Sequence, residues 1–420
     1  MNPIEFTAAN PQPGVTLAAD STSGLICGGV SVPAKGLNYG ITYELNSLDD
    51  AKAKGLSTAY DDANSVLVYN HISEFFRLAG GKKARLFFMV VPQATPQSNM
   101  WLLPEFARKL LIDAKGKVQQ IATAYNPVAY TPTIVNGLPI DVTAAIGEAQ
   151  GLADWARAQA MPVHAFVEGK AWSGNASSSA DLRALEISAG VISSCPKVTL
   201  VIGQDWTQAD KVAIFNKYAA VGTALGSCAN ANVHENFGWA IYDISSAATP
   251  KAFLVPSLSN HQTIFDAAAQ LDTLDAKGYV FATTYPQYPG VYWNNDHSCV
   301  AVVVNLEDGS INEHCVHYSR VGNKVDRVLY AALLPFAKSP QLADPATGKI
   351  SSLSIATIEG AAKNALDARM GNLNQFSGRN VAINPNSDVL IAKELNIAAD
   401  IVPVGSTDKI KISRTLNTTI

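Results

Sequence analysis

The feature of this sequence that most restricts its fold is a series of short apolar runs separated by helical patterns. The clearest run, residues 84–91 (ARLFFMVV), is almost continuously apolar. Similar runs occupy residues 163–167, 198–202, 238–242 and 279–283. Runs of this length and composition are typical of strands buried on both faces of a parallel sheet. They predict a strand at each of these places.

Between the runs, apolar residues recur at helical spacing. From Asp141 to residue 156 they fall on one stripe, Asp141 is placed to cap the helix, and Pro162 ends it. Further helices are predicted at residues 60–78, 208–225 and 263–277. This alternation predicts an α/β core with a mainly parallel sheet and helices on both faces.

The pattern changes after residue 305. An Asp-Gly turn at 305–309 precedes two predicted helices, 320–336 and 355–373, and three predicted strands, 389–395, 401–404 and 409–420. This order predicts a smaller α+β domain. We therefore divide the chain into an extended N-terminal arm (1–36), an α/β core domain (37–305), a C-terminal α+β domain (306–407) and a C-terminal β-strand arm (408–420).

Both ends of the chain are predicted to be extended. Residues 1–36 are rich in proline and glycine and have no helical period. In the last twelve residues, Ile410, Ile412 and Leu416 alternate with polar residues, which predicts a half-buried strand. A single terminal strand is marginal unless it joins a sheet, in its own chain or in a neighbour. The termini therefore allow two interpretations. In the first, the N-terminus is frayed and the C-terminal segment is an ordinary edge strand. In the second, both termini are arms that complete a sheet in the next subunit.

The charge content favours the second interpretation. Charged residues make up 16% of the chain, against roughly 25% in an average globular domain. A monomer needs a charged surface to stay dispersed. A chain this poor in charge is expected to hide surface against partners.

Several classes of protein are disfavoured by composition. The net charge of −4 gives no reason to expect a nucleic-acid partner, and no apolar window is long enough to span a membrane. The first residues (MNPIEF) lack the basic and apolar regions of a secretory signal. Five widely spaced cysteines are a poor disulfide framework and fit a reducing cytoplasm. We expect the protein to be made and assembled inside a cell.

Sequence motifs of common enzymes are missing. The chain has no Walker phosphate loop, no Gly-x-Gly-x-x-Gly after a strand, no Gly-x-Ser-x-Gly elbow and no His-Glu-x-x-His. A Ser-His-Asp triad is recognised by geometry and not by order, so residues such as Asp61, Asp62 and His71 carry little signal. We predict no catalytic residue and no cofactor.

Two further clusters each allow two interpretations. His297, Cys299, Cys315 and His317 would converge as zinc ligands if their segments formed a hairpin. We interpret them instead as core and loop residues with backbone partners, and predict no metal. The aromatic run at 285–293 (YPQYPGVYW) is either a carbohydrate platform or, as we favour, a Pro-Gly loop packed by its own rings.

The order of segments resembles the tail sheath family of contractile phages and related injection systems. The resemblance covers most of the chain, in layout more than in sharp motifs. Its segments are residues 38–55 (NYGITYELNSLDDAKAKG), 69–81 (YNHISEFFRLAGG) with the following strand, 325–334 (VDRVLYAALL), 344–350 (DPATGKI) and 401–405 (IVPVG). No protruding outer domain is apparent, which would make this a compact sheath subunit.

The resemblance implies a core like that of subtilisin without its catalytic residues, and a C-terminal domain whose sheet is completed by arms of adjacent subunits. It implies six-fold rings stacked helically around an inner tube, with baseplate and tail-terminator proteins as further partners. Assembly would take place in the bacterial cytoplasm, into a virion tail or an injection-system particle. The residues expected to make inter-subunit arm contacts are Ile4, Phe6, Val15, Leu17, Ile410, Ile412 and Leu416.

Two functions of other classes remain as alternatives. One is a soluble α/β hydrolase whose nucleophile is unidentified. The other is a surface protein that binds glycans through the Tyr-Pro loop.

Overall fold

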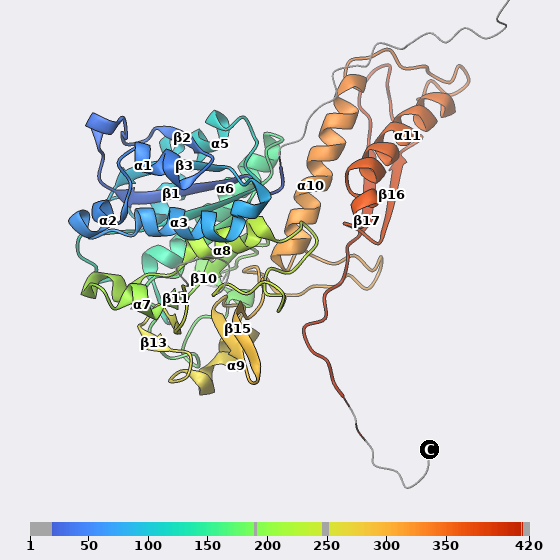
Figure 1. Ribbon diagram of the computed structural model, residues 1–420. Coiled ribbons are helices and arrows are strands. Elements are labelled where there is room, and N and C mark those ends of the chain that lie inside the picture. Colours follow the sequence, from blue (N-terminus) through green and yellow to red (C-terminus); the bar gives the residue numbers. More distant parts are fainter. Residues whose placement is uncertain (1–18, 189–190, 246–251, 413, 415–420) are drawn as a thin grey trace, which may run out of the picture.

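A six-stranded sheet organises the N-terminal part of the chain (Figure 1). The computed structural model describes residues 19–188, 191–245, 252–412 and 414. The sheet consists of β1 (Ser23–Gly29), β2 (Thr42–Leu45), β3 (Leu86–Pro92), β4 (Gln120–Ala124), β7 (His164–Glu168) and β10 (Val198–Val201). Its order is β2-β3-β1-β4-β7-β10, and every neighbouring pair is parallel except β2–β3. The predicted parallel sheet and three of its five predicted strands are confirmed.

Helices cover both faces of this sheet, as predicted. One face carries α1 (Leu48–Ala53), α2 (Thr58–Asn64), α3 (Val68–Ala79) and α8 (Val221–Asn230), and the other carries α4 (Gln97–Leu102), α5 (Lys109–Asp113) and α6 (Ile140–Ala158). Successive strand side chains point to opposite faces. Phe88 therefore belongs to the first hydrophobic core, while Phe87 and Met89 belong to the second.

The predicted N-terminal arm (1–36) is wrong for residues 23–29. These residues form β1, which lies between β3 and β4 in the middle of the sheet, with Cys27 opposite both Val90 and Ala124. Leu25, Ile26 and Cys27 are completely buried. The strand was missed because glycines at both of its ends lower the strand propensity and suggest a loop.

Two glycines allow α8 to cross α3 at very short range. A Cβ atom on Gly222 would lie 2.4 Å from the backbone oxygen of His71, and one on Gly226 would lie 2.9 Å from the Cα atom of Phe75. Real Cβ contacts are not this short, so the two backbones can approach only where the side chain is a hydrogen atom. The Gly222 amide also donates to His71 Nδ1 at 3.3 Å.

Gly222→Ala is expected to lower the free energy of unfolding by about 2–3 kcal/mol, because the added methyl group forces two packed helix backbones apart. Gly151→Ala is the matched control, since Gly151 lies in α6 and no atom stands within 4 Å of the place that its added methyl group would take. That change is expected to be neutral or to stabilise by up to about 1 kcal/mol. Urea unfolding measures both, and equal effects of the two substitutions would refute the tight crossing.

Smaller elements complete the core. They are β5 (Ile134–Val135), β6 (Leu138–Pro139), β8 (Glu186–Ser188), β9 (Val191–Ile192), β11 (Gly203–Asp205), β12 (Pro256–Leu258), β13 (Gln262–Thr263), β14 (Ala282–Tyr285), β15 (Tyr288–Trp293), α7 (Trp206–Ala209) and α9 (Ala268–Ala276). β11, β12 and β13 form an antiparallel sheet, and β14–β15 is a hairpin. The strand predicted at 279–283 is partly confirmed by β14, and the helix predicted at 263–277 by α9.

Three of the predicted elements in the core are wrong in detail. Residues 238–242 form a turn rather than a strand, closed by the Asn236 side chain, which accepts from the Gly238 amide at 2.7 Å. The helix predicted at 60–78 is broken into α2 and α3 by Ser65, which has a left-handed backbone. The helix predicted at 208–225 is interrupted because the buried Gln204 side chain binds backbone carbonyls of Asn216 and Tyr218.

A second unit lies beside the core (Figure 1, orange and red). It contains α10 (Val316–Leu333), α11 (Ser352–Arg369) and the antiparallel pair β16 (Gly378–Ile383) and β17 (Ile397–Val402). Both predicted helices exist, and β17 partly confirms the strand predicted at 401–404. The strand predicted at 389–395 is wrong, because Asp388 accepts from the amides of Leu390 and Ile391 and closes a turn there.

Polar side chains join α10 to the core. Ser319 bonds His164 Nδ1 at 2.9 Å, Asn323 Oδ1 accepts from Lys197 Nζ at 2.8 Å, and Lys324 pairs with Asp20 at 2.6 Å. His164, Lys197, Ser319 and Asn323 are buried, so their polar groups require these partners. The second unit is thereby held in a defined orientation.

Candidate functional site

The segment after β17 leaves the body of the protein (Figure 1). Residues 403–412 form no strand, and Ile410 and Ile412 are 78% and 87% exposed. The strand predicted at 409–420 is therefore not formed within residues 409–412. One contact ties this segment back to the core, from Asn295 Nδ2 to Asp408 Oδ2 at 3.3 Å. The other expected arm contacts, namely Ile4, Phe6, Val15, Leu17 and Leu416, lie outside the described residues.

The β16–β17 pair has open edges in the described part of the chain. Val381 and Ile383 of β16 are buried against α10 and α11, whereas no residue of β17 is fully buried. Each strand has one partner only. Two-stranded sheets are marginally stable, and an unpaired edge presents a row of free donors and acceptors. The pair is therefore a suitable acceptor for further strands.

A second exposed apolar surface precedes α10. Val304 and Ile311 form a backbone bridge that closes a hairpin-like loop. Its exposed large apolar side chains are those of Val302, Val303, Val304, Leu306 and Ile311. Contiguous exposed apolar residues of this kind mark interaction surfaces.

The carboxyl ends of the parallel strands, where α/β enzymes usually bind ligands, hold a buried pair. Glu168, at the end of β7, accepts from the amides of Tyr125 (2.6 Å) and Ala219 (3.0 Å), and its Oε1 lies 3.8 Å from Lys170 Nζ. Burial is the main influence on the pair: it raises the pKa of Glu168 and lowers that of Lys170. These contacts connect β7 to two neighbouring loops, so Glu168 has a structural role.

The Asp and His residues considered for a triad also have structural contacts. Asp61 accepts from the amides of Tyr69 (2.9 Å) and Asn70 (2.8 Å) at the start of α3, and burial raises its pKa to about 7. Burial lowers the pKa of His71 to about 3, so its ring is neutral at pH 7. Asp62 is exposed on α2.

The four His and Cys residues weighed as zinc ligands do not converge. His297 turns to Asp275 (2.9 Å) and Arg183 (3.1 Å), and Cys299 is buried in a backbone bridge with Cys195. Cys315 and His317 do meet, and Asp296 joins them. Sequence reasoning omitted Asp296 from this set although it directly precedes His297 in the chain.

The aromatic run 285–293 forms the β14–β15 hairpin. The rings of Tyr285 and Tyr288 each lie 5.7 Å from that of Tyr292. The predicted packing of the run by its own rings is found for these three tyrosines, but the run is a strand hairpin rather than an irregular loop.

Comparison with known families settles which family this chain represents. Residues 1–297 match the family model described as DUF2586, N-terminal domain. The chain belongs to the DUF2586 family. No curated protein matches the sequence.

Solved structures show the fold of this DUF2586 chain more fully. A chain of the anti-feeding prophage baseplate, determined by cryo-EM with six-fold symmetry, is similar with a TM-score of 0.61 at 12% identity, covering 99% of both chains. A chain of the contracted helical sheath of the same prophage is similar with a TM-score of 0.59 at 12% identity, also over 99% of both. The matches to these particle components thus cover 99% of the DUF2586 chain, and the described residues share their fold.

None of the helices in the described part of the DUF2586 chain combines the length and the apolarity that crossing a bilayer requires.

Proposed function

We propose that this DUF2586 chain is a structural subunit of a contractile tail sheath. Subunits would form six-fold rings, stacked helically around an inner tube, and contraction would drive the tube through a target envelope. The observation that carries this proposal is the likeness to the anti-feeding prophage chains, which spans 99% of both chains and so includes the second unit as well as the core.

The terminal segments would act as arms. The open edges of β16 and β17 and the exposed residues Ile410 and Ile412 support a strand exchange in which one subunit completes the sheet of the next. Backbone hydrogen bonds of this kind tether neighbours while the rigid cores slide and rotate. A heterologous contact repeats as an open helical array.

The core, which includes β1 and extends to residue 305, would be a subtilisin-like scaffold without catalysis. The structural contacts of Glu168, Asp61 and His71 support a non-enzymatic role. Contraction would repack core surfaces, and opposite charges across them would favour the contracted packing in a salt-dependent way.

Besides copies of itself, the subunit would contact the inner tail tube protein and the baseplate and tail-terminator proteins. It would assemble in the bacterial cytoplasm and become part of a virion tail or an injection-system particle. The baseplate likeness and its six-fold symmetry support this placement.

Electron microscopy of the purified protein at high concentration tests the proposal. We expect rings or tubes of uniform diameter, because a chain with unpaired sheet edges and exposed apolar segments is completed by its neighbours. A monodisperse monomer that turns over ester or peptide substrates would contradict it.

A further inference from the structure

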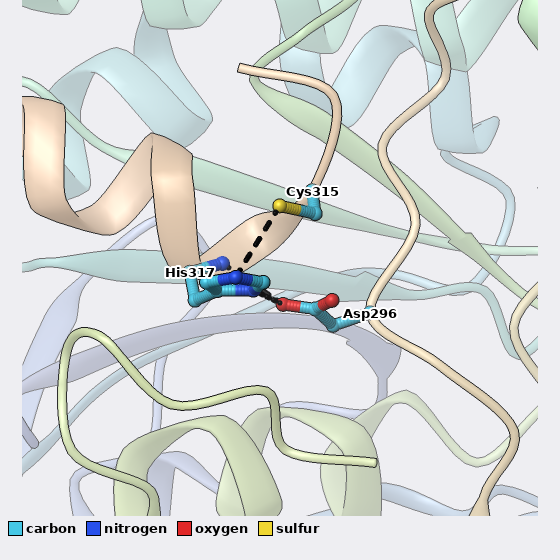
Figure 2. A group of neighbouring side chains, drawn as sticks. All are labelled: Asp296, Cys315 and His317. Carbon is cyan, nitrogen blue, oxygen red and sulfur yellow. Dashed lines mark hydrogen bonds and ion pairs between the residues drawn. The ribbon is translucent and has the colours of Figure 1, made fainter. Parts of the chain in front are cut away.

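Three side chains capable of binding a metal meet where the core leads into α10 (Figure 2). Asp296 lies in the loop after β15, Cys315 directly precedes α10, and His317 is in its first turn. The backbone holds these segments together, since the Val316 amide donates to the Asp296 carbonyl at 2.8 Å. One ligand atom of each residue lies within 4.8 Å of the others, and all three residues are buried.

His317 is oriented so that its Nε2 faces the thiol. Its Nδ1 lies 2.6 Å from Asp296 Oδ2, and its Nε2 lies 3.7 Å from Cys315 Sγ. A carboxylate only accepts hydrogen bonds, so Nδ1 is the donor to Asp296 and Nε2 is the ring nitrogen left to bind a metal. A carboxylate behind the ring is how proteins commonly orient a metal-binding histidine.

Asp296 is left with an oxygen that has no partner. Its Oδ2 accepts from both the amide and Nδ1 of His317, but the buried Oδ1 accepts no hydrogen bond. A buried carboxylate oxygen without a donor is unfavourable. A carboxylate at Nδ1 favours a cation at Nε2 of the same ring, as in carboxylate–histidine–zinc arrangements.

We propose that Cys315 Sγ and His317 Nε2 bind a divalent transition metal of the zinc class, with Asp296 orienting the His317 ring from Nδ1. Thiolate and imidazole are usual zinc ligands. Metal–ligand lengths of about 2.3 Å to sulfur and 2.0 Å to nitrogen place two ligands of a tetrahedral zinc about 3.6 Å apart. The separation of 3.7 Å between Cys315 Sγ and His317 Nε2 matches this value.

Cys315, His317 and Asp296 are also arranged like the nucleophile, the base and the orienting acid of a cysteine-dependent enzyme. The Cys315 thiol is nevertheless unsuited to attack a substrate. Cys315 is only 6% exposed, and burial raises the pKa of its thiol well above the ordinary value. A nucleophile requires access and a lowered pKa. A bound metal cation would favour the thiolate instead, because it displaces the thiol proton.

The metal would strengthen the joint between the core and α10, because a metal on Nε2 makes His317 Nδ1 a stronger hydrogen-bond donor to Asp296. Asp296 belongs to the loop after the core hairpin, whereas Cys315 and His317 belong to the start of α10. Because the metal would bind only to the folded chain, it would stabilise this joint. The inference does not depend on the proposed function, since it concerns the single chain.

Metal analysis of the full chain, purified without chelator, tests the site. We expect about one zinc per chain, and at least about 10-fold weaker binding for Cys315→Ser and His317→Asn. The asparagine amide keeps a donor for Asp296 but lacks Nε2. Cys27→Ala is the matched control, because Cys27 is a buried cysteine on β1 and its loss is expected to leave binding unchanged.

Cobalt substitution of the wild-type chain gives a second readout that needs no variant. We expect a thiolate-to-cobalt charge-transfer absorption, which zinc abolishes by competition. A wild-type chain that binds neither metal, or that binds cobalt without this absorption, would overturn the proposal, as would variants that bind zinc as tightly as the wild type.

Discussion

Removing residues 408–420 is expected to leave a folded monomer that no longer forms tubes. Ile410 and Ile412 are almost fully exposed in the single chain, so their loss costs little packing. In the proposed assembly the same side chains become half buried in a neighbour's sheet, and the backbone gains strand hydrogen bonds. Size-exclusion chromatography, thermal unfolding and electron microscopy measure the two effects separately.

Point substitutions sharpen this test. The double substitution Ile410→Asp and Ile412→Asp places charges on the apolar side of the segment and is expected to abolish tubes at unchanged thermal stability. Lys411→Ser is the matched control, because Lys411 lies between them on the opposite side of an extended chain. Tubes formed by the shortened chain or by the aspartate variant would refute the role of the C-terminal arm.

Arg327→Ala is expected to lower the free energy of unfolding by about 3–5 kcal/mol. Arg327 lies on α10, is 9% exposed, and donates to the carbonyls of Gly116, Val118 and Pro162 in the core. Its removal leaves these carbonyls without their charged donor and opens a cavity at the joint. Urea unfolding of the monomer measures the loss.

Arg157→Ala is the matched control for this joint. Arg157 also reaches α10, through Asp326 at 2.8 Å, but its side chain is 61% exposed. Exposed ion pairs contribute roughly 0–1 kcal/mol, so little change is expected. Arg327→Lys keeps the charge without the forked geometry and is expected to recover only part of the loss. Similar effects of Arg327→Ala and Arg157→Ala would show that burial of the guanidinium is unimportant.

The candidate metal site shows why sequence reasoning stops short of side-chain geometry. From the sequence, the segments of His297 and Cys315 meet only if they form a hairpin, and the structure does pair their backbones. The His297 ring nevertheless turns to Asp275, while Asp296 turns to His317. Which of two adjacent side chains faces a partner depends on the local backbone path, and no motif spacing encodes it.

Helix capping gives a second case. Asp141 stands at the start of α6, where its type predicts a cap for that helix. Its carboxylate instead accepts from the amides of Gln97 (2.9 Å) and Ser98 (3.2 Å), at the start of α4. The residue type correctly indicates a cap, but the choice of helix follows from the packing of α4 on α6.

Local patterns were sufficient for the fold class of the core. Continuous apolar runs such as 84–91 can be satisfied only by burial on both faces, so a helix-covered parallel sheet follows from the chain itself. Long-range contacts were required for the rest: the central place of β1, the crossing at Gly222, the joint at Arg327 and the meeting of Asp296 with Cys315 and His317. Each of these depends on groups from distant segments whose positions exist only once the chain has folded, because propensity and periodicity describe neighbours along the chain and not neighbours in space.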